Sequence, residues 1–178
     1  MRRLTTLLAL VGLAAACREE ARPVTEATVA DSADQVLFGV RHYVTRDGVV
    51  QALVLADTAF VFDARQIAEL RGVRTTFFSS TGVEHSVLTS REATYEGRTG
   101  DMQARGHVIV VASDGRRLET EVLRYVRTAG KISSDVPFVF QEPGRRMAGR
   151  SFISDPDFRN LEAQGVSGAA GRVTIPDR

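Results

Sequence analysis

The chain alternates apolar and polar residues over many short stretches, which is the pattern of strands that bury one face. We expect strands at 36–45, 49–62, 86–95, 104–111, 117–125, 132–140 and 146–153. Residues 66–70 fit a helical turn by local propensity, but we interpret them as the approach to a strand. Val73, Thr75 and Phe77 then share one face of that strand. The segment 158–164 predicts one short helix or a final strand.

Four turn signals follow one another at similar spacing, and their glycines are Gly48, Gly82, Gly115 and Gly144. These glycines are 34, 33 and 29 residues apart. The two best copies superpose at an offset of 30, which pairs Tyr95 with Tyr125, Met102 with Ile132, Val108 with Phe138 and Val110 with Phe140. A period in this range indicates one hairpin unit used repeatedly, with a core made continuous by stacking. The pattern therefore predicts a long trough or barrel.

One strand carries a conflict of phase. Leu118, Thr120 and Val122 fall on one face, whereas Leu123 and Tyr125 fall on the opposite face. Because successive side chains of a strand alternate between faces, an extra residue is needed to bring both groups to the same side. We therefore predict a β-bulge near Val122 and Leu123.

The first segment, 1–16, has the form of an export signal. A positive start precedes the apolar stretch 4–13, and small residues lead to Cys17. Ten residues of helix reach about 15 Å, which is half of a hydrocarbon core of about 30 Å. Cys17 stands where a lipoprotein signal places the residue that becomes acylated, although ordinary signal cleavage before a free Cys17 is the alternative. Residues 17–34 are polar and small, which predicts a flexible tether.

Composition and charge indicate a single folded domain and argue against a nucleic-acid-binding protein. The 178 residues suit one domain, with 43% hydrophobic and 25% charged residues. Removing Arg2 and Arg3 with the signal leaves 21 basic against 22 acidic residues, a net charge of −1. We expect no nucleic-acid partner, because such a partner requires a basic stripe. A single cysteine excludes an internal disulfide.

Candidate catalytic and metal-binding groups do not form a constellation. Three histidines are scattered through the expected strands: His42, His85 and His107. They have no partner at the spacing that a metal site requires. Ser151 lacks the following glycine of a nucleophile elbow. Asp155 and Asp157 flank a proline and are interpreted as a turn cap. We therefore expect no catalytic residue, no metal, no cofactor and no enzyme.

An apolar interior remains as the candidate site. Its lining is expected to include Phe77, Tyr95, Met102, Val108, Val110, Tyr125, Ile132, Phe138 and Phe140. These residues either fill their own space as a core or line a groove with room for acyl chains. The pattern of the sequence leaves both alternatives open.

Six segments in order resemble one known family. They are VLTS at 87–90, ARGHV at 104–108, DGRRLET at 114–120, LRY at 123–125, KISSDVPF at 131–138 and GRSFISDP at 149–156. The series is similar to the LptC family, the periplasmic component of the lipopolysaccharide export machine, within an OstA-like group that includes LptA. The resemblance covers about 35–168.

The resemblance implies an open β-jellyroll over 35–168, followed by a mobile tail at 169–178. Its interior, with the nine residues above, would bind the acyl chains of lipopolysaccharide. Its implied partners are an LptA-like protein and an inner-membrane ABC permease with its ATPase. The expected location is the periplasm, anchored through acylated Cys17, although family members commonly keep a transmembrane helix instead. The alternatives are a structural or assembly β lipoprotein with a filled core, and a soluble LptA-like bridge protein.

Overall fold

The computed structural model describes residues 32–46 and 48–167, and within them eleven strands form one antiparallel sheet. The elements are β1 (Gln35–Arg46), β2 (Val49–Phe62), the 3-10 turn η1 (Asp63–Arg65), β3 (Ile67–Phe78), β4 (Glu84–Glu96), β5 (Met102–Ala112), β6 (Arg117–Val126), β7 (Lys131–Ser134), β8 (Phe138–Glu142), β9 (Arg145–Gly149), β10 (Ser151–Ser154) and β11 (Glu162–Gln164). The expected all-β fold is confirmed. The signal, Cys17 and the tail 169–178 lie outside the described residues.

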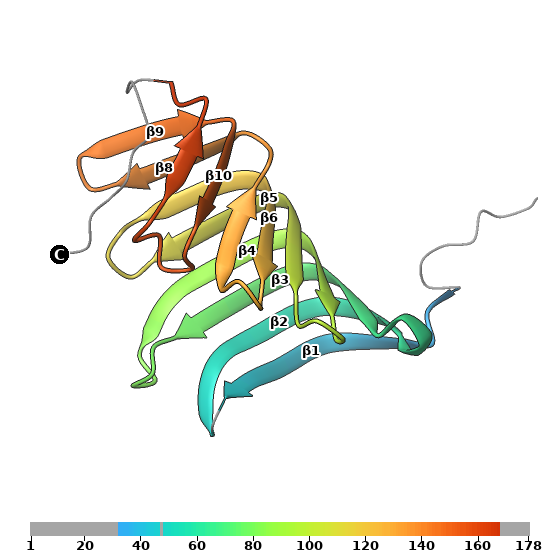
Figure 1. The fold of residues 1–178 in the computed structure, drawn as a ribbon. Helices are drawn as coiled ribbons and strands as arrows, with labels where there is room; N and C mark the ends of the chain where they lie inside the picture. Colours follow the sequence, from blue (N-terminus) through green and yellow to red (C-terminus); the bar gives the residue numbers. More distant parts are fainter. Residues whose placement is uncertain (1–31, 47, 168–178) are drawn as a thin grey trace, which may run out of the picture.

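The sheet is a single path that divides at β6. Strands β1 to β6 pair in chain order, and Figure 1 shows them stacked from β1 at one end toward β8, β9 and β10 at the other. One end of β6 pairs with β7, which continues through β10 to β11. The other end of β6 pairs with β8, which continues to β9. The N-terminal edge is therefore one long strand, whereas the C-terminal edge has two short ones.

A line of broken pairing crosses the sheet from β1 to β6, and we call it the crease. The β1–β2 ladder skips Gly39 and Asp57, and the β3–β4 ladder skips Gly72 and Arg91. The full row contains Gly39, Asp57, Gly72, Arg91, Gly106 with His107, and Glu121. Its three glycines have φ between 59° and 73°. A left-handed backbone costs other residues about 1–2 kcal/mol, so glycine is the natural choice there.

The crease separates the sheet into two walls that face each other. Wall I contains the halves of β1 to β6 on the side of the turns at Gly48, Gly82 and Gly115, together with β8 and β9. Wall II contains the opposite halves of β1 to β6, together with β7, β10 and β11. On β2 the buried positions pass from Ala56 to Ala59, and on β3 from Leu70 to Val73. This odd step across the crease lets both halves of each strand turn apolar side chains inward. The walls pack on each other, as the contact of Phe138 on β8 with Phe152 on β10 demonstrates.

The crease also corrects two predicted strands. The expected strand 132–140 is divided into β7 and β8, and the expected strand 146–153 is divided into β9 and β10. The breaks fall at 135–137 and at Arg150, which continue the crease beyond β6. In β1 to β6 the chain bends at the crease, and each strand stays paired with its neighbours before and after the bend. Pro137 has no backbone N–H to continue a ladder, so the bend there becomes a complete break.

Three local expectations have mixed outcomes. The strand approach near 66–70 is correct from Ile67 onward, but Gln66 is a left-handed residue that closes η1. The bulge predicted near Val122 and Leu123 is wrong by one strand. The extra residue lies on β5, where Gly106 and His107 together oppose Glu121 of β6. The segment 158–164 ends in a strand, β11, and not in a helix.

Candidate functional site

The interior between the walls is closed at the C-terminal end of the sheet. The side chains that fill it are mostly large: Ala104, Val108, Val110, Leu118, Leu123, Ile132, Phe138, Phe140, Met147, Phe152, Phe158 and Leu161. Leu118 and Leu161 are 0% exposed, and the rings of Phe138 and Phe152 meet at 4.9 Å between centroids. This half of the interior is a packed core.

The N-terminal half has smaller side chains and an open edge. Its buried cluster consists of Val54, Ala56, Ala59, Leu70, Val73 and Ala93. Val40 packs against this cluster from β1, but Leu37 on the same strand is 45% exposed. Among the strands that the structure describes, β1 pairs with β2 alone and leaves its other edge unpaired. Apolar interior surface is therefore accessible at this end of the molecule.

The nine predicted interior residues divide between these environments. Five of them lie fully within the packed core: Val108, Val110, Ile132, Phe138 and Phe140. Tyr125 packs against that core and is half-buried. Phe77 and Met102 are half-buried, and Tyr95 is 40% exposed. Their role in lipid binding stays a prediction.

A short segment, Asp155 to Leu161, crosses the mouth of the interior opposite the crease, and we call it the strap. It leaves β10 in wall II and reaches the tip of wall I, where the Asp157 carboxylate lies 2.9 Å from Nε2 of His85. Arg116 also donates a hydrogen bond of 2.6 Å to the Asp157 carbonyl oxygen. Between these anchors Phe158 enters the interior and packs on Phe140, with centroids 5.6 Å apart. The strap therefore joins the two walls across the C-terminal half.

Asp155 organises the strap. Its carboxylate accepts hydrogen bonds from the backbone N–H groups of Arg159 and Asn160, and from the side chain of Asn160. Burial raises the pKa of Asp155, but these hydrogen bonds outweigh it and hold the pKa below its usual value. Asp155 is thus ionised at neutral pH. The predicted turn cap is confirmed for Asp155, whereas the Asp157 carboxylate contacts His85 instead.

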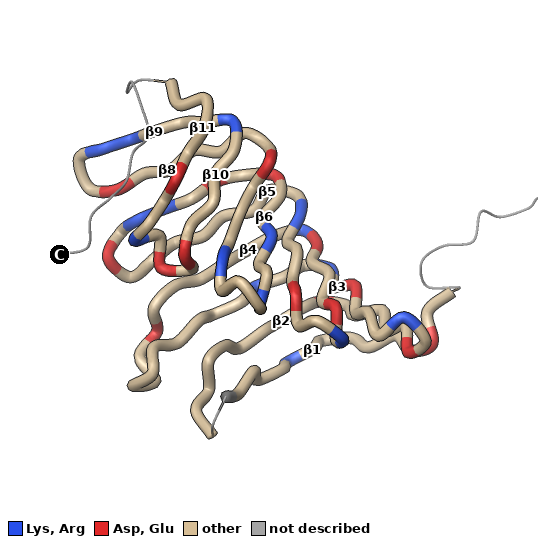
Figure 2. Tube along the Cα trace, viewed as in Figure 1, with Lys and Arg blue, Asp and Glu red and all other residues tan. Residues whose placement is uncertain are grey.

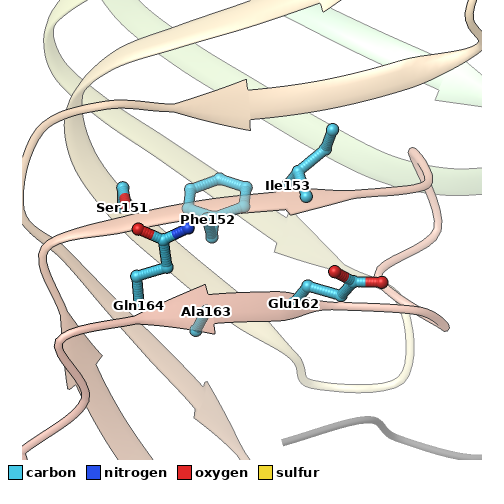
Figure 3. A pocket seen from close by; sticks show the side chains of 6 residues that line it. All are labelled: Ser151, Phe152, Ile153, Glu162, Ala163 and Gln164. Atoms are coloured by element: carbon cyan, nitrogen blue, oxygen red, sulfur yellow. The ribbon is translucent and has the colours of Figure 1, made fainter. Parts of the chain in front are cut away.

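Two surface hollows lie outside the interior. One of about 430 Å³ lies over the crease between β1, β2 and β3 and is lined in part by Gly39, Asp57 and Arg74. The other, of about 170 Å³, lies between β10 and β11 (Figure 3), where Phe152 and Gln164 are neighbours.

Charges of both signs occur together on this sheet. Figure 2 shows basic and acidic residues interleaved along the trace. Several pairs are close neighbours, such as Arg124 with Asp135 at 2.9 Å and Arg116 with Asp114 at 2.6 Å. The hydrogen bond from Arg116 lowers the pKa of Asp114. Among the described residues, no group of three or more His, Cys, Asp and Glu is placed to hold a metal ion.

Sequence reasoning missed both the crease and the strap. The crease had a signal, because Gly39, Gly72 and Gly106 are 33 and 34 residues apart in the middle of expected strands. A glycine inside a strand often marks a bulge or bend. The strap had no such signal, since its anchors His85 and Arg116 are far from it in sequence.

Comparison with known proteins decides the family. A family model described as lipopolysaccharide-assembly, LptC-related, matches residues 4–159. The chain belongs to this LptC-related family. A search of curated proteins found no match. In the part of the chain that the structure describes, no helix has the length and apolarity to cross a membrane.

The fold also matches a solved structure. LptH, the LptA homologous periplasmic component of the lipopolysaccharide transport device of Pseudomonas aeruginosa, is similar with a TM-score of 0.53 and 16% identity. The match covers 71% of this chain and 90% of that chain. It supports the open β-jellyroll expected for this LptC-related protein, which has unclosed edges at β1 and at the C-terminal end.

Proposed function

We propose that this LptC-related protein is a periplasmic bridge component that receives lipopolysaccharide from an inner-membrane ABC transporter and passes it to an LptA-like jellyroll. The observation that carries the proposal is the pair of facing apolar walls, accessible at the β1 edge, in a member of a lipopolysaccharide-assembly family. An acyl chain of a dozen carbons resists water by roughly 10 kcal/mol, at ~0.8 kcal/mol per methylene. Its passage through an aqueous compartment therefore requires continuous apolar cover.

Lipid acyl chains would enter between the walls at the N-terminal half. Ala56, Ala59 and Ala93 line this half with short side chains, and Tyr95 at the tip of wall II is partly exposed. The packed half would accept an acyl chain when the walls move apart. Phe138 and Phe140 would then contact lipid in place of Phe152 and Phe158. We propose that all nine predicted interior residues contact the acyl chains.

Photocrosslinking tests the lipid path. A photoreactive residue at Tyr95 should capture lipopolysaccharide, whereas the same residue at the adjacent Thr94, on the other face of β4, should not. Phe140 and its outward neighbour Val139 provide a second matched pair on β8. Equal capture from inward and outward positions, or capture from the outward ones alone, would reject an interior path.

We also propose that acylated Cys17 anchors the domain in the inner membrane through the tether 17–34. A cysteine directly after three alanines and an apolar stretch supports this proposal. Mass spectrometry of the mature N-terminus should show a lipid mass on Cys17, and Cys17→Ser should release the protein to the soluble periplasmic fraction. An unmodified mature N-terminus would favour a soluble bridge protein instead.

A further inference from the structure

The C-terminal edge of wall II is covered by part of the chain itself. β11 is three residues long and pairs with β10 through Ser151 to Ile153. Figure 3 shows the two strands side by side. The hollow of about 170 Å³ is lined by residues of both strands. After β11 the chain crosses to wall I, where the Ser167 N–H donates to the Ala148 carbonyl of β9. Residues 155–167, which we call the plug, therefore cover the outer edge of β10 through β11 and contact the outer edge of β9 through Ser167.

The plug is held in a strained conformation. Phe158 has φ of 55°, a left-handed value that a bulky aromatic residue rarely adopts. Ser154, directly before the strap, is 1% exposed, and its Oγ has no hydrogen-bond partner among the described residues. The contact of Asp157 with His85 that fastens the strap is about one-third exposed. Strain of this kind persists only where surrounding contacts impose it, and it favours release once they weaken.

Within residues 32–46 and 48–167, no segment covers the opposite edge of the sheet in the same way. β1 offers twelve residues of strand with its outer edge free, and Phe38 on it is 79% exposed. The two ends thus differ, since β1 offers an edge of twelve residues, whereas the edge of β10 becomes accessible to another strand only when the three-residue β11 leaves it. Free strand edges recruit further strands through their backbone N–H and C=O groups.

We propose that the plug is a displaceable stand-in for a partner strand, and that an edge strand of an LptA-related jellyroll replaces β11 on β10. The inference rests on the proposed function and adds how the outgoing end opens. When β11 leaves, the strap leaves with it, and Phe158 and Leu161 withdraw from the interior. The space they vacate is apolar and continuous with the packed core, so an acyl chain can occupy it. Docking of the partner and opening of the outgoing end are then one event.

A reversible lock tests the displacement. Ile153 and Glu162 face each other across β10 and β11 and are both exposed, so Ile153→Cys with Glu162→Cys, in a Cys17→Ser background, should form a disulfide. The matched control is Leu55→Cys with Arg74→Cys, a cross-strand pair of β2 and β3 on the N-terminal side of the sheet. Binding of the LptA-related protein of the same organism is measured without lipid, before and after reduction. The oxidised lock should bind at least about tenfold more weakly and recover on reduction, because the competent state is removed.

A second variant acts in the opposite direction. His85→Ala removes the exposed anchor of the strap without touching the core, so it should speed hydrogen exchange of 155–167 and tighten partner binding. Equal partner affinity of the oxidised and reduced lock would overturn the displaceable plug. Lipopolysaccharide uptake by the wild-type chain is measured separately, and its absence would overturn the proposed function while the lipid-free binding result still decides the plug.

Discussion

At the scale of single residues, the crease depends on glycines that turn the backbone where neighbouring side chains leave no room. A Cβ on Gly72 would collide with the Asp57 carboxylate on the adjacent strand, and one on Gly106 would lie 3.2 Å from the Cβ of Arg91. Gly39, on the free edge, has the same left-handed backbone but open space around it. All three positions therefore require a left-handed backbone, but only Gly72 and Gly106 also lack space for a side chain.

Two alanine substitutions should separate these parts. Gly39→Ala adds only the left-handed strain, which is expected to cost about 1 kcal/mol in the free energy of unfolding. Gly72→Ala adds the same strain and a collision with Asp57, so its cost should exceed that of Gly39→Ala by about 1–3 kcal/mol. Urea unfolding of both variants measures the difference. Equal costs would mean that Asp57 moves aside freely.

Asp155 predicts a pH dependence of the strap. Its folded pKa is lowered, so its stabilisation is complete above the unfolded value of 3.8 and is lost as the pH falls through the folded pKa. Asp155→Asn should therefore unfold about 1–2 kcal/mol more easily than wild type at pH 7, because it loses hydrogen bonds to a charged acceptor. This difference should shrink as the pH is lowered below about 4. A difference that stays constant down to pH 2 would contradict the assignment.

At the scale of elements, the two halves of the sheet differ in what holds them. β5, β6 and β8 share the cluster of large side chains, while β1 and β2 pack on alanines and short aliphatic groups. Apolar burial stabilises by about 25 cal/mol per Å², so strands that bury larger side chains are held more strongly. The opening of the molecule should begin at the β1 edge.

Native-state hydrogen exchange should report this gradient. Amides of β5 and β6 are expected to exchange near the rate of global unfolding, and those of β1 and β2 through smaller local openings. Leu118→Ala, at a position 0% exposed, should cost about 2–5 kcal/mol and raise exchange throughout the sheet. Thr58→Ala, at a half-buried site of β2, serves as the control and should change exchange little. Uniform protection from β1 to β6 would contradict the gradient.

At the scale of the whole molecule, the sheet is a folded trough that is accessible at one end and plugged at the other. β1 lies at the accessible end, and Phe158 with Leu161 fills the plugged end. Under the proposed function, we expect lipid to enter at the β1 end and to leave only after the plug opens the second end. The asymmetry is a property of the whole sheet, because one end is a single strand of twelve residues and the other consists of short strands with the strap packed across them.

A space-filling substitution tests whether lipid uses the accessible half. Ala59→Leu places a larger side chain on the inner face of β2 and should lower lipopolysaccharide binding about tenfold, while overpacking costs about 1–3 kcal/mol of stability. Thr58→Leu, one residue earlier and on the outer face, is the matched control and should bind normally. Circular dichroism confirms that both variants are folded. Unchanged binding by Ala59→Leu would move the lipid site elsewhere.

The sequence alone predicted the strand content and most turns, and it did so for local reasons. The Asp-Gly turn at Asp114 and Gly115 and the strand 49–62 follow from alternation and turn chemistry, and β2 has the expected bounds. The family resemblance was likewise carried by ordered local segments and is confirmed by the match over 4–159. Five of the nine predicted interior residues are buried in the core, because a period of two decides the face of a strand.

Tertiary structure alone decided which inward-facing residues form a closed core and which face open space. Val110 and Tyr95 share the same inward pattern, yet one is 5% and the other 40% exposed. Alternation encodes the face of a strand but not the distance to the opposite wall. That distance is decided by the crease, the division of the sheet after β6, and a strap that joins Asp157 to His85 across 72 residues of chain. Such contacts exist only once both walls are folded, so no local pattern records them.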